Sequence, residues 1–334
     1  MTTERTGGDV PAQGTGPGTE VVETAAADLP VEPIVALLGA VAAADGVEAL
    51  GEQPVRALRT RSTAVRHLVA RSGDDAAGAG PLGYAQLEES GEGATAELAV
   101  DPTARGRGVG AALLAAVLDR APDAAVWAHG DLPAAGALAG RAGLRRAREL
   151  LKMLRDPADG PAVTTPDAPE GVELGTLAEA ASEGGTRWPG LDARAELLRV
   201  NNAAFDWHPE QGGWTAAQLD ERLAVDWVDP AGVFLAVETG ESGPRLLGFH
   251  WTKVERTPDD ALEGEVYVVG VDPAAQGRRL GTVLTRLGVA FLERSGADHV
   301  TLYVEGDNLP ARRTYERLGF RVVHTDVTYS RARG

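Results

Sequence analysis

The chain has 334 residues and a formal net charge of −17, with 43% hydrophobic residues, 24% charged residues and no cysteine. This composition is typical of a globular protein long enough for two domains, and it excludes disulfides, thiolate metal sites and a cysteine nucleophile. The negative charge argues against nucleic-acid binding, and no apolar run approaches the roughly 20 residues that span a bilayer. We expect a cytoplasmic monomer that binds no nucleic acid, no membrane and no metal.

The first half of the chain begins with a tail and continues into a domain that we place at residues 20–155. Residues 1–19 are rich in glycine, threonine and proline and have no apolar core, which predicts a disordered tail and not a secretory signal. The segment 98–120, "LAVDPTARGRGVGAALLAAVLDR", combines an apolar strand, a proline turn, a glycine-rich loop and a helix. A further strand and helix follow in "VWAHGDLPAAGALAGRAGL" (126–144).

Residues 156–170 are rich in proline, aspartate and glycine, so they are expected to link the first domain to a second one at residues 171–334. In the second domain the order of strands and helices predicts α+β packing on a mixed sheet. The expected strands are 172–177, 232–239, 245–255, 265–271 and 299–305, with a final strand or hairpin at 320–331, and the expected helices are 193–205, 215–225, 282–295 and 309–319.

The two halves repeat one another. The tripeptide "VDP" occurs at Val100–Pro102 and again, 171 residues later, at Val271–Pro273. Downstream, the pattern of 126–144 recurs in "LYVEGDNLPARRTYERLGF" (302–320). Because the strands, loops and helices recur in the same order, the sequence predicts two homologous domains.

Each repeated segment leads from a strand into a helix through a loop suited to an anion. In the first copy the loop is "RGRGVG" (105–110). Its glycines let the backbone approach a ligand, and the helix offers free N–H groups and the positive end of its dipole to phosphate or pyrophosphate. Neither copy has the Lys-Ser or Lys-Thr of a P-loop, nor a G-x-G-x-x-G fingerprint directly after the strand. A purely structural strand-to-helix turn is the alternative.

The segment "VDPTARGRGVG" resembles the acyl-CoA-binding motif R/Q-x-x-G-x-G/A of the GNAT N-acetyltransferases, and "NLPARRTYERLGF" is similar to that family's N-x-x-A-x-x-x-Y-x-x-x-G-F segment. The resemblance spans almost the whole chain after the tail. It implies two tandem GNAT domains, each a mixed, mostly antiparallel sheet flanked by helices, with acetyl-CoA as cosubstrate.

The resemblance also implies which residues contact acetyl-CoA. In the first domain they are Leu98, Ala99, Val100, Arg105, Gly106, Arg107, Gly108, Val109 and Gly110. In the second they are Val269, Gly270, Val271, Gln276, Gly277, Arg278, Arg279, Leu280, Gly281, Thr282, Asn308, Leu309, Pro310, Ala311, Arg312 and Arg313.

The second loop departs from the motif because Arg279 occupies the usual glycine position. If the backbone there must approach the pyrophosphate closely, a long side chain weakens CoA binding. We instead expect ordinary helical dihedral angles at this residue, so that the side chain points away from the pyrophosphate and the backbone N–H can still bind it.

Acetyl transfer to an amine needs a base for the amine, a donor for the developing oxyanion and an acid for the leaving thiolate. By resemblance, Glu265 is the base, acting through water, and Tyr315 is the acid beside the CoA sulfur. The backbone N–H of Val271 is expected to bind the thioester oxygen. The structural alternatives are a solvated strand-end carboxylate for Glu265 and a core aromatic for Tyr315.

The strings "NNAAFDWHPEQGGW", "LLGFHWTKV" and "GEVYVVGVDPAAQ" are similar to tandem family members whose acceptor is the cysteine amine of a cysteinyl-glucosaminyl-inositol. Such an acceptor calls for carboxylates, a lysine and aromatic hydroxyls. The resemblance implies that the acceptor contacts Glu52, Glu210, Lys253, Glu265 and Tyr303. Trp214 either forms a wall of the pocket or anchors a loop.

When the two repeats are aligned, Leu138 of the first domain occupies the position of Tyr315 in the second, and the first domain has no tyrosine at a neighbouring position. We therefore expect that domain to bind acetyl-CoA without turnover and to supply Glu52 to the acceptor site. Two alternatives remain open. The chain acetylates another small primary amine, such as an aminoglycoside or a peptide N-terminus, or it is a catalytically silent acyl-CoA sensor.

Overall fold

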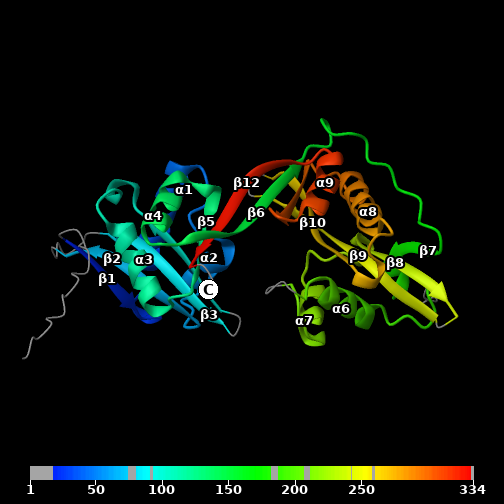
Figure 1. The fold of residues 1–334 in the computed structure, drawn as a ribbon, viewed down its shortest axis with the longest axis horizontal. Helices are drawn as coiled ribbons and strands as arrows, with labels where there is room; N and C mark the ends of the chain where they lie inside the picture. The colour runs from blue at the N-terminus through cyan, green and yellow to red at the C-terminus, as the bar shows by residue number, and fades with distance from the viewer. Residues whose placement is uncertain are drawn as a thin grey trace, which may run out of the picture. The chain divides into compact units, whose positions relative to one another are not determined.

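The computed structural model describes residues 18–73, 80–90, 93–181, 187–206, 211–241, 243–257 and 260–331. The chain folds into two compact units, one of residues 1–149 and 326–334 and the other of residues 150–325 (Figure 1). The boundary between these units falls within two strands, β6 (Arg145–Arg155) and β12 (Arg321–Ser330), each of which passes from one unit into the other. The expected linker, residues 156–170, contains no helix or strand.

The first unit is built on a sheet with the strand order β1-β2-β3-β4-β5-β12. Neighbouring strands are antiparallel except β4 and β5, which are parallel and are joined by helix α3. The strands are β1 (Thr19–Thr24), β2 (Val65–Ser72), β3 (Gly83–Ser90), β4 (Gly93–Val100) and β5 (Ala125–Ala128). The helices are α1 (Val31–Asp45), α2 (Glu52–Arg59), α3 (Val109–Arg120) and α4 (Pro133–Arg141), with 3-10 turns η1 (Ala26–Asp28), η2 (Pro102–Ala104) and η3 (His129–Asp131).

The second unit repeats this plan with the strand order β6-β11-β10-β9-β8-β7. Here β10 and β11 are the parallel pair, joined by helix α8, and the other pairs are antiparallel. The strands are β7 (Val172–Thr176), β8 (Val233–Gly240), β9 (Gly243–Arg256), β10 (Leu262–Val271) and β11 (His299–Glu305). The helices are α5 (Leu177–Ala180), α6 (Ala193–Ala204), α7 (Ala216–Leu223), α8 (Leu280–Arg294) and α9 (Leu309–Arg317), with turns η4 (Pro230–Gly232) and η5 (Pro273–Ala275).

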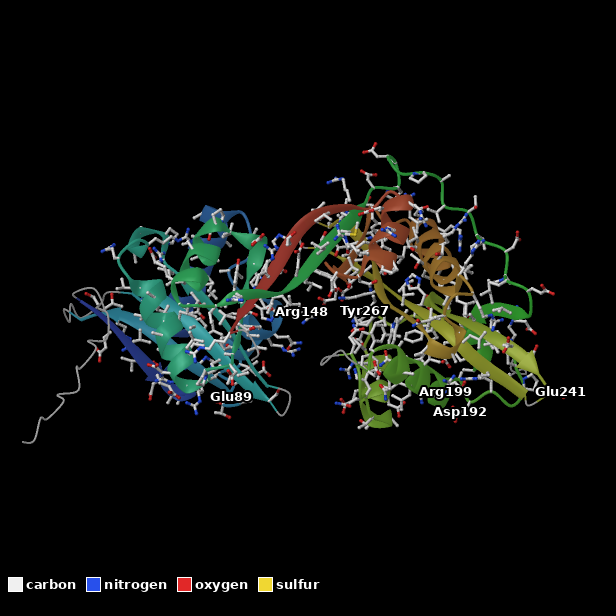
Figure 2. All side chains as sticks on the ribbon, viewed as in Figure 1. Glu89, Arg148, Asp192, Arg199, Glu241 and Tyr267 are labelled. Carbon is white, nitrogen blue, oxygen red and sulfur yellow. The ribbon has the colours of Figure 1, made fainter. Side chains whose placement is uncertain are left out.

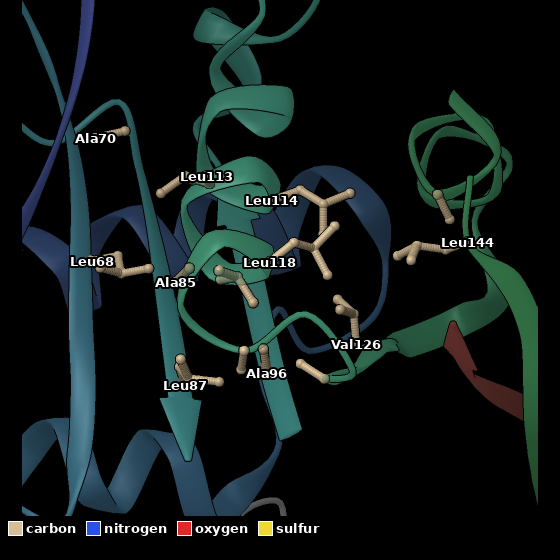
Figure 3. Close-up of a cluster of buried hydrophobic side chains, with 14 of the residues drawn as sticks. Leu68, Ala70, Ala85, Leu87, Ala96, Leu113, Leu114, Leu118, Val126 and Leu144 are labelled. Carbon is tan, nitrogen blue, oxygen red and sulfur yellow. The ribbon is translucent and has the colours of Figure 1, made fainter. Parts of the chain in front are cut away.

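Helix α3 closes the core of the first unit over the sheet. Leu113 and Leu118 lie on its buried face and pack with Leu68, Leu87 and Val126 from the strands (Figure 3). Burying a leucine side chain contributes about 1.5–3 kcal/mol, so this face fixes the helix on the sheet. The position of α3 in turn fixes the loop that precedes it.

The sheet of the second unit is covered on both faces. Helices α8 and α9 cover one face through a cluster that includes Val266, Leu302 and Tyr315. On the other face α6 and α7 pack on Trp251 and Val268. A bulge in β10 between Val266 and Val268 turns these two neighbours of Tyr267 to opposite faces. Among the helices that the structure describes, none is both long and apolar enough to span a membrane.

Candidate active site

The repeated "VDP" turn has the same geometry in both units, and its aspartate sets that geometry. The Asp101 carboxylate accepts a hydrogen bond from the Thr103 backbone at 2.8 Å, and the Asp272 carboxylate accepts one from the Ala274 backbone at 2.9 Å. These bonds shape the turn between strand and loop. The sequence motif repeated the aspartate, but its capping role was not predicted.

Asp272 is also the buried centre of an ion cluster. It is 4% exposed and accepts hydrogen bonds from Arg199 at 2.6 Å and Arg245 at 2.9 Å. Burial alone would raise the pKa of Asp272, but these arginines and the Ala274 amide bring that pKa below its usual range. Arg199 comes from α6 (Figure 2), so the cluster fixes the turn before α8 to a helix on the opposite face of the sheet.

Helices α3 and α8 both begin directly after a residue in the left-handed conformation. That residue is Gly108 in the first unit, with φ 88°, and Arg279 in the second, with φ 63°. Neither residue caps its helix with a side chain. The first-turn N–H groups therefore receive no hydrogen bond from the preceding side chain and can bind an anion.

The expectation of helical dihedral angles at Arg279 was wrong. The loop keeps the backbone path of its glycine-containing counterpart, with Gly277 at φ 82° matching Gly106 at φ 74°. An arginine with positive φ costs roughly 1–2 kcal/mol, because its Cβ crowds the following carbonyl oxygen. The loop conformation is thus set by its surroundings and not by the residue at position 279.

The parallel strands of each unit separate toward their C-terminal ends. Strands β10 and β11 pair from Glu263 to Val266, after which β10 pairs with β9 alone and β11 with β6. In the first unit β4 and β5 pair from Thr95 to Glu97. The predicted acyl-CoA segments 98–100 and 269–271 therefore lie where the parallel pairing has ended.

This separation leaves backbone groups facing the gap. The Asp272 N–H donates to the Leu247 carbonyl of β9 at 2.8 Å. Because alternate residues of an antiparallel pair face opposite neighbours, the N–H groups of Val269 and Val271 point toward the side that β11 has left. In the first unit the Asp101 N–H donates to Leu82 at 3.0 Å, so the same reasoning applies to Val100.

Other predicted acyl-CoA residues already have partners in the protein. Arg105 makes two hydrogen bonds with Asp45, at 2.7 and 2.8 Å, and Arg278 pairs with Glu238 at 2.9 Å. Asn308 caps α9 by accepting from the Ala311 N–H at 3.2 Å. Arg312 donates to the Gly306 carbonyl at 2.7 Å. Their contacts with acyl-CoA stay predictions.

Glu265 lies on the sheet face opposite α8. It is directly opposite Lys253 of β9 and Thr301 of β11, so these three side chains share that face. Burial raises the pKa of the Glu265 carboxyl, and the charge of Lys253 opposes this effect. Within the described ranges no residue makes a hydrogen bond or an ion pair with this carboxylate, which is the state that a general base requires.

Residues around Glu265 form a polar and aromatic lining. Tyr303 follows Thr301 by two positions on β11 and therefore faces the same side, where Lys152 of β6 is its register partner. Tyr267, labelled in Figure 2, packs edge-on against Trp227 with ring centres 5.0 Å apart, and the Lys253 ammonium lies 5.3 Å from the Trp227 ring. Lys152, Tyr267 and Trp227 were not predicted from the sequence.

Tyr315 belongs to the cluster under α8 and α9. It is 9% exposed and packs against Phe320 with ring centres 5.9 Å apart. Burial raises the pKa of its phenol to about 12, so the hydroxyl stays protonated at neutral pH. No residue in the described part of the chain hydrogen-bonds this hydroxyl, which leaves its proton available.

The remaining predicted residues have different outcomes. Glu52 is the first residue of α2 in the first unit, and its assignment stays a prediction. Glu210 lies outside the described residues. Trp214 is 8% exposed and packs in the core, with its backbone N–H donating to Asn202 at 2.9 Å, so it anchors the loop after α6.

The first unit holds a half-buried histidine between two carboxylates near the end of its parallel strand pair. The two ring nitrogens of His129 lie 3.0 Å from Glu97 and 3.2 Å from Asp326. Burial opposes the charge on His129, but the two carboxylates outweigh it and raise the pKa of the ring to about 10. Glu97 also accepts from the Gly51 N–H at 2.7 Å, which fixes the start of α2.

Comparison with known proteins gives the family. The model of the acetyltransferase (GNAT) family matches residues 41–143 and 200–320. A mycothiol acetyltransferase of Rhodococcus opacus is 50% identical over 303 residues, which cover 89% of this chain and 93% of that protein. One from Nocardia farcinica is 49% identical, covering 88% and 91%.

Two solved structures share the fold. A GCN5-related N-acetyltransferase from Sphaerobacter thermophilus superposes with a TM-score of 0.65 at 23% identity, covering 93% of this chain and 94% of its own. A tandem GNAT protein from the clavulanic acid biosynthesis pathway gives a TM-score of 0.61 at 19% identity, covering 95% and 99%. Both confirm the predicted tandem arrangement of α+β domains. The chain belongs to the acetyltransferase (GNAT) family, as a relative of the mycothiol acetyltransferases.

Proposed function

We propose that this protein transfers the acetyl group of acetyl-CoA to the cysteine amine of cysteinyl-glucosaminyl-inositol, the last step of mycothiol synthesis. The observation that carries the proposal is the identity of about 50% to mycothiol acetyltransferases over about nine-tenths of the chain. The carboxylate of Glu265, which has no hydrogen-bond or ion-pair partner among the described residues, lies on a face lined by lysine and tyrosine and supports the same reaction.

The second unit supplies the groups that bind acetyl-CoA. The N–H groups at the start of α8 hold the pyrophosphate, and the backbone facing the gap between β10 and β11 holds the pantetheine arm. The N–H of Val271 donates to the thioester oxygen, on which negative charge develops during attack. Fixing the thioester in this gap converts the reaction with the amine into an effectively unimolecular step.

The chemical step is a balanced exchange of one bond for another. The neutral amine nitrogen attacks the thioester carbon, forming the C–N bond, while Glu265 accepts a proton from the amine through a water molecule. The C–S bond then breaks, and Tyr315 donates its phenolic proton to the departing CoA sulfur. Both residues return to their starting states by proton exchange with solvent. These protein groups meet each requirement of the reaction, so the proposal includes no metal.

The environments of the two residues suit these roles. Burial raises the pKa of Glu265, which makes its carboxylate a stronger base, and the charges of Lys253 and Lys152 oppose this rise. Burial raises the pKa of Tyr315 to about 12, so its phenol is protonated before the thiolate forms. Lys253 and Tyr303 border the same face and would bind hydroxyl groups of the acceptor.

The first unit would bind acetyl-CoA without turning it over. It has the anion-binding loop, but α4 carries Leu138 at the place of Tyr315. Thr95 and Glu265 hold equivalent places in the two parallel strand pairs, so the first unit lacks the base as well as the acid. We assign the reaction to the second unit and take the whole protein as a monomer, which a mass measurement in solution would test.

The test is CoA release from acetyl-CoA with four acceptors: the cysteinyl pseudo-disaccharide, an aminoglycoside, a short peptide with a free N-terminus, and buffer alone. The cysteinyl acceptor should give the highest kcat/KM, and Glu265→Gln should lower kcat by about 10²–10⁴. A higher kcat/KM with another amine would replace the proposed substrate. Binding of acetyl-CoA without release on any amine would instead indicate a sensor.

A further inference from the structure

Lysine is very rare in this chain, and both of its lysines lie in the proposed active site. Lys152 and Lys253 are the only two lysines among 32 lysine and arginine residues. The other residues of that set are all arginine. The two lysines of this arginine-rich chain therefore lie together on one face of one sheet.

The strand register places these lysines on either side of Glu265. Lys253 is directly opposite Glu265 on β9. On the other side, β11 presents Thr301 opposite Glu265 and Tyr303 two residues later, and Lys152 of β6 pairs with Tyr303. The neighbours of Lys152 on β6, Leu151 and Met153, belong to the core under α8 and α9, so Lys152 points to the face of Glu265.

The two lysines differ in their partners. Lys253 pairs with Glu255 at 2.6 Å and lies beside the Trp227 ring. The Lys152 ammonium lies 5.6 Å from the centre of the Tyr303 ring and has no carboxylate within ion-pair distance among the residues that the structure describes. A half-buried ammonium without a counter-ion is costly for stability, and such sites are frequent where a charge has a chemical task.

We propose that Lys152 is a positioning residue for the acetyl transfer, whose ammonium keeps the Glu265 carboxylate ionised and therefore able to accept the proton of the acceptor amine. This inference rests on the proposed role of Glu265 as the base.

Several charged groups face Glu265, and among those that the structure describes only the two lysines lower its pKa. On its own strand and on β9, Glu263 and Glu255 raise the pKa of Glu265, as burial does. Lys253 and Lys152 act in the opposite direction. The other titratable groups near this face are Tyr267 on β10, Tyr303 and His299 on β11, and Arg222 on α7, with His299 bound to Glu263 at 2.9 Å.

Lysine also suits this place better than arginine does. A guanidinium can bind both oxygens of a carboxylate at once, and such a pair would occupy the lone pair that accepts the proton. An ammonium is a compact charge that stabilises the carboxylate through space and leaves an oxygen free. Arginine at position 152 should thus preserve the ionisation of Glu265 but reduce its use as a base.

The experiment compares Lys152→Met and Lys152→Arg with the wild type through the pH dependence of kcat/KM. Lys152→Met should move the acidic limb upward by about 0.5–1 pH unit, because one positive charge beside Glu265 is lost. Lys152→Arg should return the limb to its wild-type position while lowering the plateau. Arg294→Met removes the same charge from the exposed end of α8 on the other face and should leave the profile unchanged.

A second measurement keeps the inference separate from the identity of the acceptor. The pKa of the Glu265 carboxyl can be followed by 13C NMR without any substrate, with Glu265→Gln used to assign the signal. An unchanged carboxyl pKa in Lys152→Met would overturn the role of Lys152 even if the acetylation assay succeeds. A raised pKa in an enzyme that does not acetylate the cysteinyl acceptor would retain the electrostatic role and reject the proposed substrate.

Discussion

Replacing Arg279 by glycine should stabilise the second unit, although it removes a charged side chain. Arg279 has φ 63°, and relief of that conformation contributes roughly 1–2 kcal/mol. Glycine also makes the unfolded chain more flexible, which lowers the free energy of unfolding by roughly 0.4–1 kcal/mol. The expected net gain is about 1 kcal/mol, or a rise in Tm of roughly 2–4 °C for a unit of this size.

Urea and thermal unfolding of Arg279→Gly would measure this gain, and Gly277→Ala is the matched control two residues earlier. Gly277 has φ 82° and no atom within 4 Å of an added Cβ, so alanine there tests backbone strain alone and should destabilise by about 1 kcal/mol. If Gly277→Ala destabilises as expected but Arg279→Gly gives no gain, the strain at Arg279 must be offset by contacts of its side chain. That result would refute the predicted stabilisation.

Three further predictions concern activity, pH and burial. Tyr315→Phe should lower kcat by about 10²–10⁴, whereas Arg105→Ala, in the first unit, should change it little; equal losses in a steady-state assay would contradict the division of labour between the units. The pKa of His129 is raised to about 10, so its contribution to stability is complete below pH 6.5 and declines by about 1.4 kcal/mol per unit as the pH rises toward 10. His129→Gln should remove this slope from urea unfolding of the first unit, and a slope that persists would exclude His129 as its source. Asp272→Asn should destabilise by roughly 1.5–3 kcal/mol in the same assay, because it weakens the charge-assisted hydrogen bonds from Arg199 and Arg245, and a loss below about 0.5 kcal/mol would reject the proposed cluster.

Much of the fold could be predicted because local patterns and tertiary packing agree. The strand expected at 265–271 and the helix expected at 309–319 correspond to β10 and α9. The expected strand at 172–177 ends one residue early, because Thr176 and Glu179 form a capping box that begins the short helix α5. A capping signal inside an apolar run is difficult to separate from the end of a strand.

The candidate site was only partly predictable from the sequence. The motif selected Glu265 and Tyr315 as candidate catalytic residues. No strand or helix was predicted over 145–155, so Lys152 could not be assigned to a face of the sheet. Pairing between distant strands decides which side chains meet, and a motif read along one segment does not contain it. Arg279 shows the same limit for the backbone, since its conformation follows from the surrounding turn and not from its own preference.

The C-terminal end of β12 has a consequence for biosynthesis. Residues 327–329 pair with β5, and Asp326 provides a carboxylate to His129, although both partners were synthesised about 200 residues earlier. During synthesis, the edge of β5 therefore stays open until β12 has emerged from the ribosome. A nascent chain of this protein would expose that edge to other chains throughout the synthesis of residues 150–325.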